Sequence, residues 1–263
     1  FGGASSETQF VGANPSSQAK LMYFLKKRHT FGKMSMDIMD SNGNIVASPA
    51  PGKSKGLNIV KWDYHQKVPK VAVGKVPSFV VAPRVLAGDY KVLITKGKDS
   101  HEHMFSVKND PASNITAAER EENRKLTLRL FDAVEDLAYL GYRIDTYVKA
   151  LEKTDSKNAK KMSSELTDLK SRLVVTTGDR YVQEAEDELR EKLNDLYNQV
   201  AQSFDKPAPV HYINADEYEK QLQAAWDDLK KMEKKYASKM NKELEKAEKK
   251  SIDLKTKEEF LAE

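Results

Sequence analysis

The side chains that commonly carry metal or proton-transfer chemistry are sparse in this chain. His101 and His103 flank Glu102, a spacing that would place both imidazoles on one face of a β-strand. A zinc site requires at least a third protein ligand, and none is evident in the sequence. We therefore interpret the two histidines as the exposed end of a hairpin rather than as a metal pair.

Acidic clusters give an equally weak signal. Asp37, Asp40 and Asn42 lie near a turn, but their spacing is not that of an EF-hand loop, so turn formation is the simpler interpretation. Glycosidase chemistry requires two carboxylates across a cleft, whereas the acidic residues of the second half follow solvated helix faces. No GxSxG, HExxH or P-loop motif occurs. We predict a chain with no catalytic constellation, no metal site and no cofactor.

Trp62 and Tyr64 are the one candidate ligand platform. They lie side by side in a strand-like stretch, and Phe24 and Phe79 are further aromatic candidates. Exposed together, these rings would form a platform for a sugar. The competing interpretation, which we favour, is that Trp62 fills a hydrophobic core.

Composition divides the chain into two halves. Residues 1–111 carry 16 Lys+Arg against 8 Asp+Glu, whereas residues 112–263 carry 28 against 32. The change in charge coincides with a change in hydrophobic pattern, so a domain boundary is predicted near Asp110 and Pro111. No apolar run approaches the length of about 18 residues that spans a membrane. The basic half carries no nucleic-acid-binding signature, so neither a membrane span nor nucleic-acid binding is expected.

The first half has the pattern of an antiparallel β-sandwich. Short alternating runs separated by turn signals predict strands at 19–25, 33–40, 45–47, 55–64, 88–95 and 104–107. Asn42-Gly43 predicts a hairpin turn. We expect 55–64 to pair with 88–95 and to contain a bulge or an edge crossing, since its apolar residues change face. The prediction is a lead-in segment at 1–16 and an immunoglobulin or fibronectin-III-like sandwich at 17–111, with 65–86 as an irregular connection that includes an edge strand.

The second half has the pattern of an antiparallel four-helix bundle at 112–250, followed by a charged tail at 251–263 that frays. Thr116 and Glu119 form a capping box at the start of the first helix. Asn214 or Asp216 is expected to cap the fourth, and Gly141 to admit a neighbouring helix. The helices are predicted from apolar residues at helical spacing: Leu126 to Leu151, Met162 to Leu173, Ala185 to Phe204 and Tyr218 to Leu244.

Several motifs stand in an order that resembles a known family. Trp62-Asp63 and Gly88-Asp89-Tyr90 are accompanied by similar stretches at 11–15, 19–25, 38–45, 105–111 and 180–197. Their order is similar to the C-terminal region of large secreted bacterial proteins with a sortilin-like, BNR-repeat β-propeller, often labelled glycosyl-hydrolase-like. The Trp-Asp and Gly-Asp-Tyr portion also looks like the immunoglobulin-like module of flagellar hook-capping proteins.

This resemblance implies an accessory role. Glycosidase-like activity would belong to the propeller, and the propeller's Ser-x-Asp-x-Gly-x-Thr-Trp box is missing here. The chain opens at Phe1 without Met and without the charged segment of a signal peptide, so we interpret it as a fragment, or as a processed or trimmed chain whose true start lies upstream. The expected function is a non-catalytic region that orients or anchors the upstream propeller, or binds a protein or glycan partner, in a secreted, periplasmic or cell-surface protein. The alternative is a carbohydrate-binding module.

Overall fold

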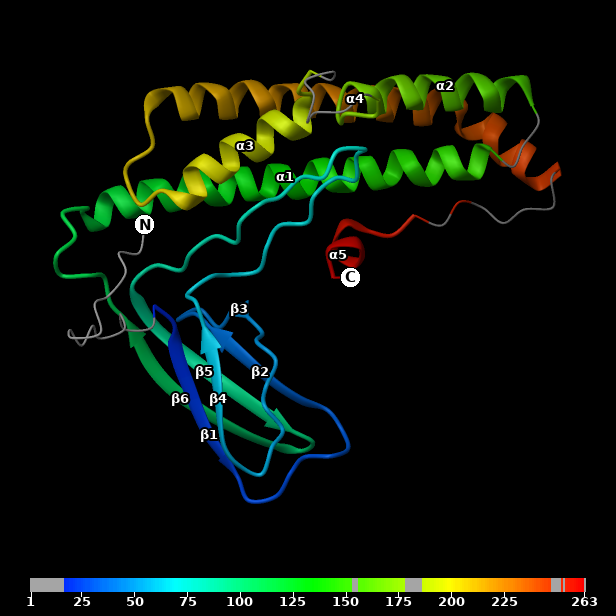
Figure 1. Ribbon diagram of the computed structural model, residues 1–263. Helices are drawn as coiled ribbons and strands as arrows, with labels where there is room; N and C mark the ends of the chain where they lie inside the picture. Colours follow the sequence, from blue (N-terminus) through cyan, green and yellow to red (C-terminus); the bar gives the residue numbers. More distant parts are fainter. Residues whose placement is uncertain (1–16, 153–155, 178–185, 247–251, 253, 263) are drawn as a thin grey trace, which may run out of the picture. The chain divides into compact units, whose positions relative to one another are not determined.

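The computed structural model describes residues 17–152, 156–177, 186–246, 252 and 254–262. The predicted lead-in segment at 1–16 lies outside these residues. The chain forms two compact units. The sheet unit comprises Phe1–Gln66 and Arg84–Asp110, and the helical unit comprises Lys67–Pro83 and Pro111–Glu263. The predicted α+β class is confirmed: strands occupy the first unit and helices the second (Figure 1).

The sheet unit contains two antiparallel sheets. The smaller sheet pairs β1 (Ala19–Leu25) with β4 (Gly56–Trp62). The larger sheet has the order β3-β2-β5-β6. Its strands are β2 (Met34–Met39), β3 (Ile45–Ala47), β5 (Gly88–Lys96) and β6 (Asp99–Val107). The predicted hairpin turn lies between β2 and β3, where Gly43 adopts a φ of +84°.

The expected pairing of 55–64 with 88–95 is wrong. β4 pairs only with β1 among the described strands, while β5 lies between β2 and β6. The expected bulge is also absent from β4, whose inward and outward positions alternate without interruption. Because Leu57 and Ile59 point outward, both faces of this strand carry apolar residues. Because apolar residues occur on both faces of β4, the sequence pattern wrongly indicated that its apolar face changes within the strand.

Trp62 connects the two sheets through the core rather than through hydrogen bonds between strands. Its side chain is 4% exposed, and its ring centroid lies 5.9 Å from Tyr90 and 6.0 Å from Phe105. The indole Nε1 donates a hydrogen bond of 2.9 Å to the carbonyl oxygen of His65. Strands of both sheets therefore share one hydrophobic core. Its buried members are Met36, Ile38, Val46, Val60, Trp62, Tyr90 and Val92.

The helical unit contains five helices among its described residues. They are α1 (Ala117–Leu151), α2 (Lys157–Ser171), α3 (Leu189–Gln202), α4 (Pro209–Lys246) and α5 (Lys257–Leu261). The predicted capping box is confirmed, because Thr116 accepts from the Glu119 amide and Glu119 accepts from the Thr116 amide. One core runs through α1 to α4, and its fully buried side chains include Leu130, Ile144, Leu166, Leu193 and Leu229.

The four longer helices do not simply alternate in direction along the chain. Arg129 pairs with Glu219 and Arg143 with Glu233, so α1 and α4 run parallel. The next two helices run the opposite way: Lys170 of α2 pairs with Asp145 of α1, and the α3 segment around Val200 lies against the start of α1. Figure 1 shows α3 (yellow) and α2 (green) along successive parts of α1. In the described residues α2 and α3 do not contact each other, and each packs against both α1 and α4.

Several predicted boundaries differ in the helical unit. α4 begins at Pro209 instead of near Asn214 or Asp216, since proline is well suited to the first turn of a helix. Phe204 lies beyond the end of α3 and is 41% exposed. The predicted Ala185 position lies outside the described residues. Instead of a charged tail alone, the last residues include α5, with its own Thr256 and Glu259 capping box.

Residues 67–83 belong to the helical unit, although the sequence placed them inside a sandwich at 17–111. The chain leaves the sheet unit after Gln66 and returns to it at Arg84. Ala72 from this excursion is 5% exposed and is part of the helical core. A Cβ atom on Gly141 of α1 would lie 3.6 Å from the Cβ of Ala72. The close neighbour of Gly141 is therefore the excursion and not another helix.

We predict that Trp62→Ala destabilises the sheet unit by about 3–5 kcal/mol, because it empties the centre of a shared core. Urea unfolding followed by near-ultraviolet circular dichroism and by hydrogen exchange of β2 and β5 measures this loss. Lys61→Ala, on the exposed side of the same strand, is the matched control and should change stability by less than about 0.5 kcal/mol. Unchanged stability together with a loss of sugar binding would contradict the core role of Trp62.

Candidate functional site

The candidate aromatic residues do not lie together on one exposed surface. Trp62 is buried, and Tyr64, at a ring-centroid distance of 5.4 Å, is half-buried and adopts a left-handed φ of 64°. Phe24 is 67% exposed and points to the opposite face of the β1–β4 sheet from Trp62, since Phe24 pairs with outward Leu57. Phe79 is 84% exposed and belongs to the helical unit. The ring faces of Trp62 are covered by core residues.

The other candidate groups take part in local structure. His101 and His103 are exposed on β6, and the described residues contain no group of three or more potential side-chain ligands that could hold a metal ion. Asp40 accepts hydrogen bonds of 2.9 Å from the amides of Asn42 and Asn44. Asp37 accepts a hydrogen bond of 2.7 Å from the Ser48 hydroxyl. The acidic residues near the turn therefore shape the β2–β3 hairpin.

Shifted pKa values also have local causes in the helical unit. Hydrogen bonds from Lys235 and Tyr236 lower the pKa of Glu165, which joins α2 to α4. Burial raises the pKa of Asp132 on α1, and burial likewise raises the pKa of Tyr147. These groups lie on helix surfaces and at helix contacts, where they serve packing.

The most distinctive surface of the sheet unit is the outward side of β1 and β4. Met22 lies opposite Ile59, and Phe24 lies opposite Leu57. These four side chains, which we call the apolar face, are 63%, 52%, 67% and 62% exposed, in that order. Large apolar side chains gathered on one surface commonly mark a binding site, whereas isolated ones do not.

Lysines stand at both ends of the apolar face. Lys20 lies opposite Lys61, and both are exposed. Lys26 and Lys55 follow at the other end, next to the pair formed by Leu25 and Gly56. Neither strand contains an acidic residue. The whole sheet unit carries 13 Lys+Arg against 8 Asp+Glu, so its surface has an excess of positive charge around an apolar centre.

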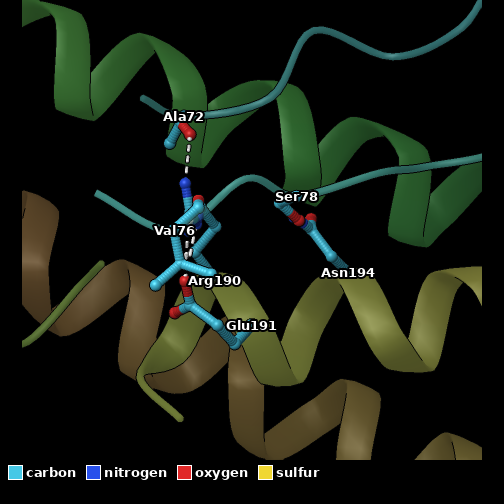
Figure 2. Close-up of polar contacts among 6 residues, drawn as sticks. All are labelled: Ala72, Val76, Ser78, Arg190, Glu191 and Asn194. Carbon is cyan, nitrogen blue, oxygen red and sulfur yellow. Dashed lines mark hydrogen bonds and ion pairs between the residues drawn. The ribbon is translucent and has the colours of Figure 1, made fainter. Parts of the chain in front are cut away.

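The helical unit contains a second distinctive feature, a buried polar cluster on α3 (Figure 2). Arg190 and Glu191 are 2% and 1% exposed and form an ion pair with each other. The Arg190 guanidinium also donates hydrogen bonds of 3.1 Å to the Ala72 carbonyl and 2.7 Å to the Val76 carbonyl. A Cβ atom on Gly74 would lie 2.5 Å from Arg190 Nη1, so any other residue there would have to displace the guanidinium from its buried position. One buried charge thus fixes the middle of the excursion.

The rest of the excursion is held by the next turns of α3. The Asn194 amide donates a hydrogen bond of 2.7 Å to the Ser78 hydroxyl. Asn198 binds the backbone on both sides, donating to the Phe79 carbonyl at 2.8 Å and accepting from the Val81 amide at 3.0 Å. Tyr197 donates to the Val81 carbonyl at 2.7 Å. The excursion lacks regular secondary structure, so α3 side chains satisfy its backbone groups.

Sequence reasoning missed both features. Leu57 and Ile59 were expected in a strand whose apolar residues change face, which hid the outward apolar side of β4. No pattern singled out Arg190, and Glu191 belongs to the acidic residues that were expected on solvated helix faces. The available signal was the spacing Arg190, Asn194, Tyr197 and Asn198, which places four hydrogen-bonding side chains on adjoining helix positions.

Comparisons with known proteins add no relative. No family model, no curated protein and no solved structure matches the chain. Within the described residues, none of the helices has both the length and the apolar character needed to cross a membrane.

We predict that Arg190→Ala destabilises the helical unit by about 3–5 kcal/mol, since it leaves the Glu191 carboxylate buried without its partner. Hydrogen exchange should increase first in residues 72–81. Arg172→Ala is the matched control, because Arg172 is 63% exposed and its ion pair with Asp228 is solvated. We expect that control to lose less than about 1 kcal/mol. Equal effects of the two substitutions would contradict the role of the buried cluster.

A pH dependence follows from the lowered pKa of Glu165. Its contribution to stability is present above the pKa of the unfolded chain and is lost as the pH falls through the lower pKa of the folded chain. The wild type should therefore lose more stability than Glu165→Gln between pH 6 and pH 3, by less than about 1 kcal/mol because the pair is solvated. Urea unfolding at a series of pH values measures this difference. Identical pH profiles would show that the contact does not contribute.

Proposed function

We propose that this chain is a non-catalytic accessory region of a larger secreted bacterial protein, and that it binds a protein domain through the apolar face of its sheet unit. The observation that carries the proposal is the exposure of Met22, Phe24, Leu57 and Ile59 on adjoining positions of β1 and β4. The resemblance noted in the sequence supplies the candidate partner, an upstream β-propeller. In this proposal the sheet unit is a sandwich of immunoglobulin type.

The energetic argument rests on the area that these side chains leave in water. Complete burial of a large apolar side chain contributes about 1.5–3 kcal/mol relative to full exposure. Four neighbouring side chains, each more than half exposed, can therefore supply the apolar centre of an interface. A small group of central residues commonly dominates the affinity of such interfaces.

The charges around the face indicate what kind of surface would meet it. Lys20 and Lys61 at one end, and Lys26 and Lys55 at the other, would face acidic residues at the rim of a partner. Such complementary charges accelerate association and select the partner more than they raise affinity. The proposed partner surface is therefore apolar at its centre and acidic at its margin.

The helical unit supports an anchoring role in a different way. Ion pairs and aromatic contacts join α1 to the parallel α4. The excursion at 67–83 fastens a segment of chain from between two strands into this unit. We propose that the helical unit contributes to orienting or anchoring the attached propeller. Secretion or cell-surface location belongs to the same proposal and rests on the resemblance.

A carbohydrate-binding module is the alternative function. Sugar platforms present aromatic rings to solvent, and Phe24 is the one aromatic side chain of the apolar face. Aliphatic Met22, Leu57 and Ile59 surround it, which favours a protein surface over a sugar ring. The experiment below separates the two functions, since the same face would serve either.

We predict that the double substitution Phe24→Ser and Leu57→Ser weakens association with the separately produced propeller at least tenfold while leaving the fold intact. Isothermal titration calorimetry at low and high salt measures the affinity, and the affinity of the wild type should fall as salt rises because lysines rim the face. Phe31→Ser is the matched control, because Phe31 is 88% exposed but lies outside both strands.

Two outcomes would contradict the proposal. One is a full-length protein that keeps its stability, export and assembly after deletion of this chain. The other is a double variant that binds the propeller as the wild type does. Loss of binding to a glycan array by the double variant, with no propeller binding by the wild type, would establish the carbohydrate-binding alternative.

A further inference from the structure

The C-terminal segment, residues 254–262, lies on α1 although the sequence gives it the composition of a tail. Phe260 of α5 stacks on Tyr142 at a ring-centroid distance of 4.9 Å and lies 5.8 Å from Tyr139. The Lys70 ammonium lies 4.1 Å from the centre of the Phe260 ring. One aromatic side chain is therefore enclosed by two tyrosines of α1 and by a lysine of the excursion.

Hydrogen bonds to the backbone hold the segment on both sides of the Phe260 ring. The Tyr139 hydroxyl donates a hydrogen bond of 2.9 Å to the Lys255 carbonyl, and the Lys255 amide donates one of 3.2 Å to the Tyr142 hydroxyl. At the end of α5, Lys67 donates to the Leu261 carbonyl at 2.9 Å, and Lys70 donates to the Phe260 carbonyl. These lysines satisfy carbonyl groups that have no donor at the end of a helix.

The site on α1 is organised by contacts that do not involve the segment. Tyr139 packs against Trp226 of α4 at 5.8 Å, and the Arg143 guanidinium lies over both rings while it pairs with Glu233. The Lys70 amide donates to Glu135 of α1 at 3.3 Å. The walls of the site therefore remain in place independently of Phe260.

The segment in turn has its own local structure. Thr256 and Glu259 form a complete capping box around α5, and none of the α5 residues is fully buried. The contacts that connect it to the rest of the unit include the Phe260 ring, the packing of Leu254 against the helical core, two carbonyl groups bound by lysines, the Lys255 backbone and an ion pair between Lys257 and Asp136. A short helical segment with one aromatic anchor in a preformed site is the usual arrangement of a bound peptide.

We propose that Tyr139, Tyr142, Lys67 and Lys70 form a peptide-binding site, and that its ligand is the C-terminal segment of the same chain. This inference is independent of the function proposed for the apolar face. A five-residue helix is unstable by itself in water, so the segment acquires its order on binding. Attachment to the same chain gives it a millimolar effective concentration, which keeps the site occupied against a free peptide.

The experiment uses the full chain and a fluorescently labelled peptide with the sequence of residues 252–263. We expect Phe260→Ala to vacate the site, so that this variant binds the peptide at least tenfold more tightly than the wild-type chain in fluorescence anisotropy. Glu258→Ala is the matched control, because Glu258 is an exposed α5 residue, and it should bind the peptide as weakly as the wild type. A labelled peptide with alanine in place of Phe260 should fail to bind the Phe260→Ala chain.

A second substitution checks the other side of the contact. Tyr142→Leu in the Phe260→Ala chain should abolish peptide binding, while circular dichroism shows the same helical content. Equal peptide binding by wild type and Phe260→Ala would overturn the proposal. A concentration-dependent dimer of the wild type that Phe260→Ala converts to monomer would also overturn it, because the occupant would then be the segment of a second copy.

Discussion

The helical unit depends on one buried charge. The Arg190 guanidinium lies in the interior, where an unpaired charge would be strongly destabilising, and it is compensated by Glu191 and by the carbonyl groups of Ala72 and Val76. Those carbonyls belong to a segment without regular secondary structure, so the same contacts satisfy both the charge and the backbone. A side chain at Gly74 would disturb this arrangement, because its Cβ atom would meet the Arg190 guanidinium. Continuous helices and an irregular excursion thus share a single core.

The directions of the helices determine which other segments cover α1. α1 and α4 run parallel, and the two shorter helices fill the antiparallel position between them one after the other. A chain that places α2 and α3 in succession along α1 leaves part of the α1 surface to be covered by other elements. The excursion covers α1 at Gly141, and the C-terminal segment covers it at Tyr139 and Tyr142. Both coverings come from segments that are distant in sequence from α1.

The two units differ in whether their outer apolar surface is covered by the chain itself. In the helical unit, Phe260 of the chain itself lies on the aromatic surface of α1. In the sheet unit, the apolar face of β1 and β4 remains open to solvent. A two-stranded sheet has few neighbours to cover its outer side. Exposed apolar residues on that side either bind a partner or promote aggregation. This contrast is the physical basis for assigning partner binding to the sheet unit and self-binding to the helical unit.

Local patterns in the sequence determined most of the secondary structure. Alternation predicted the strands, Asn42-Gly43 predicted the hairpin, and Thr116 with Glu119 predicted the start of α1. Each of these signals acts within a few residues, because strand pleat, turn and helix cap are local geometries. The α+β class and the burial of Trp62 followed from the same patterns.

Contacts between distant residues were decided only by the tertiary structure. The sequence did not determine that β4 pairs with β1, that α4 runs parallel to α1, or that residues 67–83 leave the sheet unit. The buried role of Arg190 was hidden for the same reason, since its partners at 72 and 76 lie more than a hundred residues away. Periodicity tells which face of an element is apolar, but it does not tell which other element will cover that face. That choice depends on the joint packing of all the elements. Tertiary packing therefore left the apolar face of β1 and β4 exposed and covered the site on α1 with the C-terminal segment.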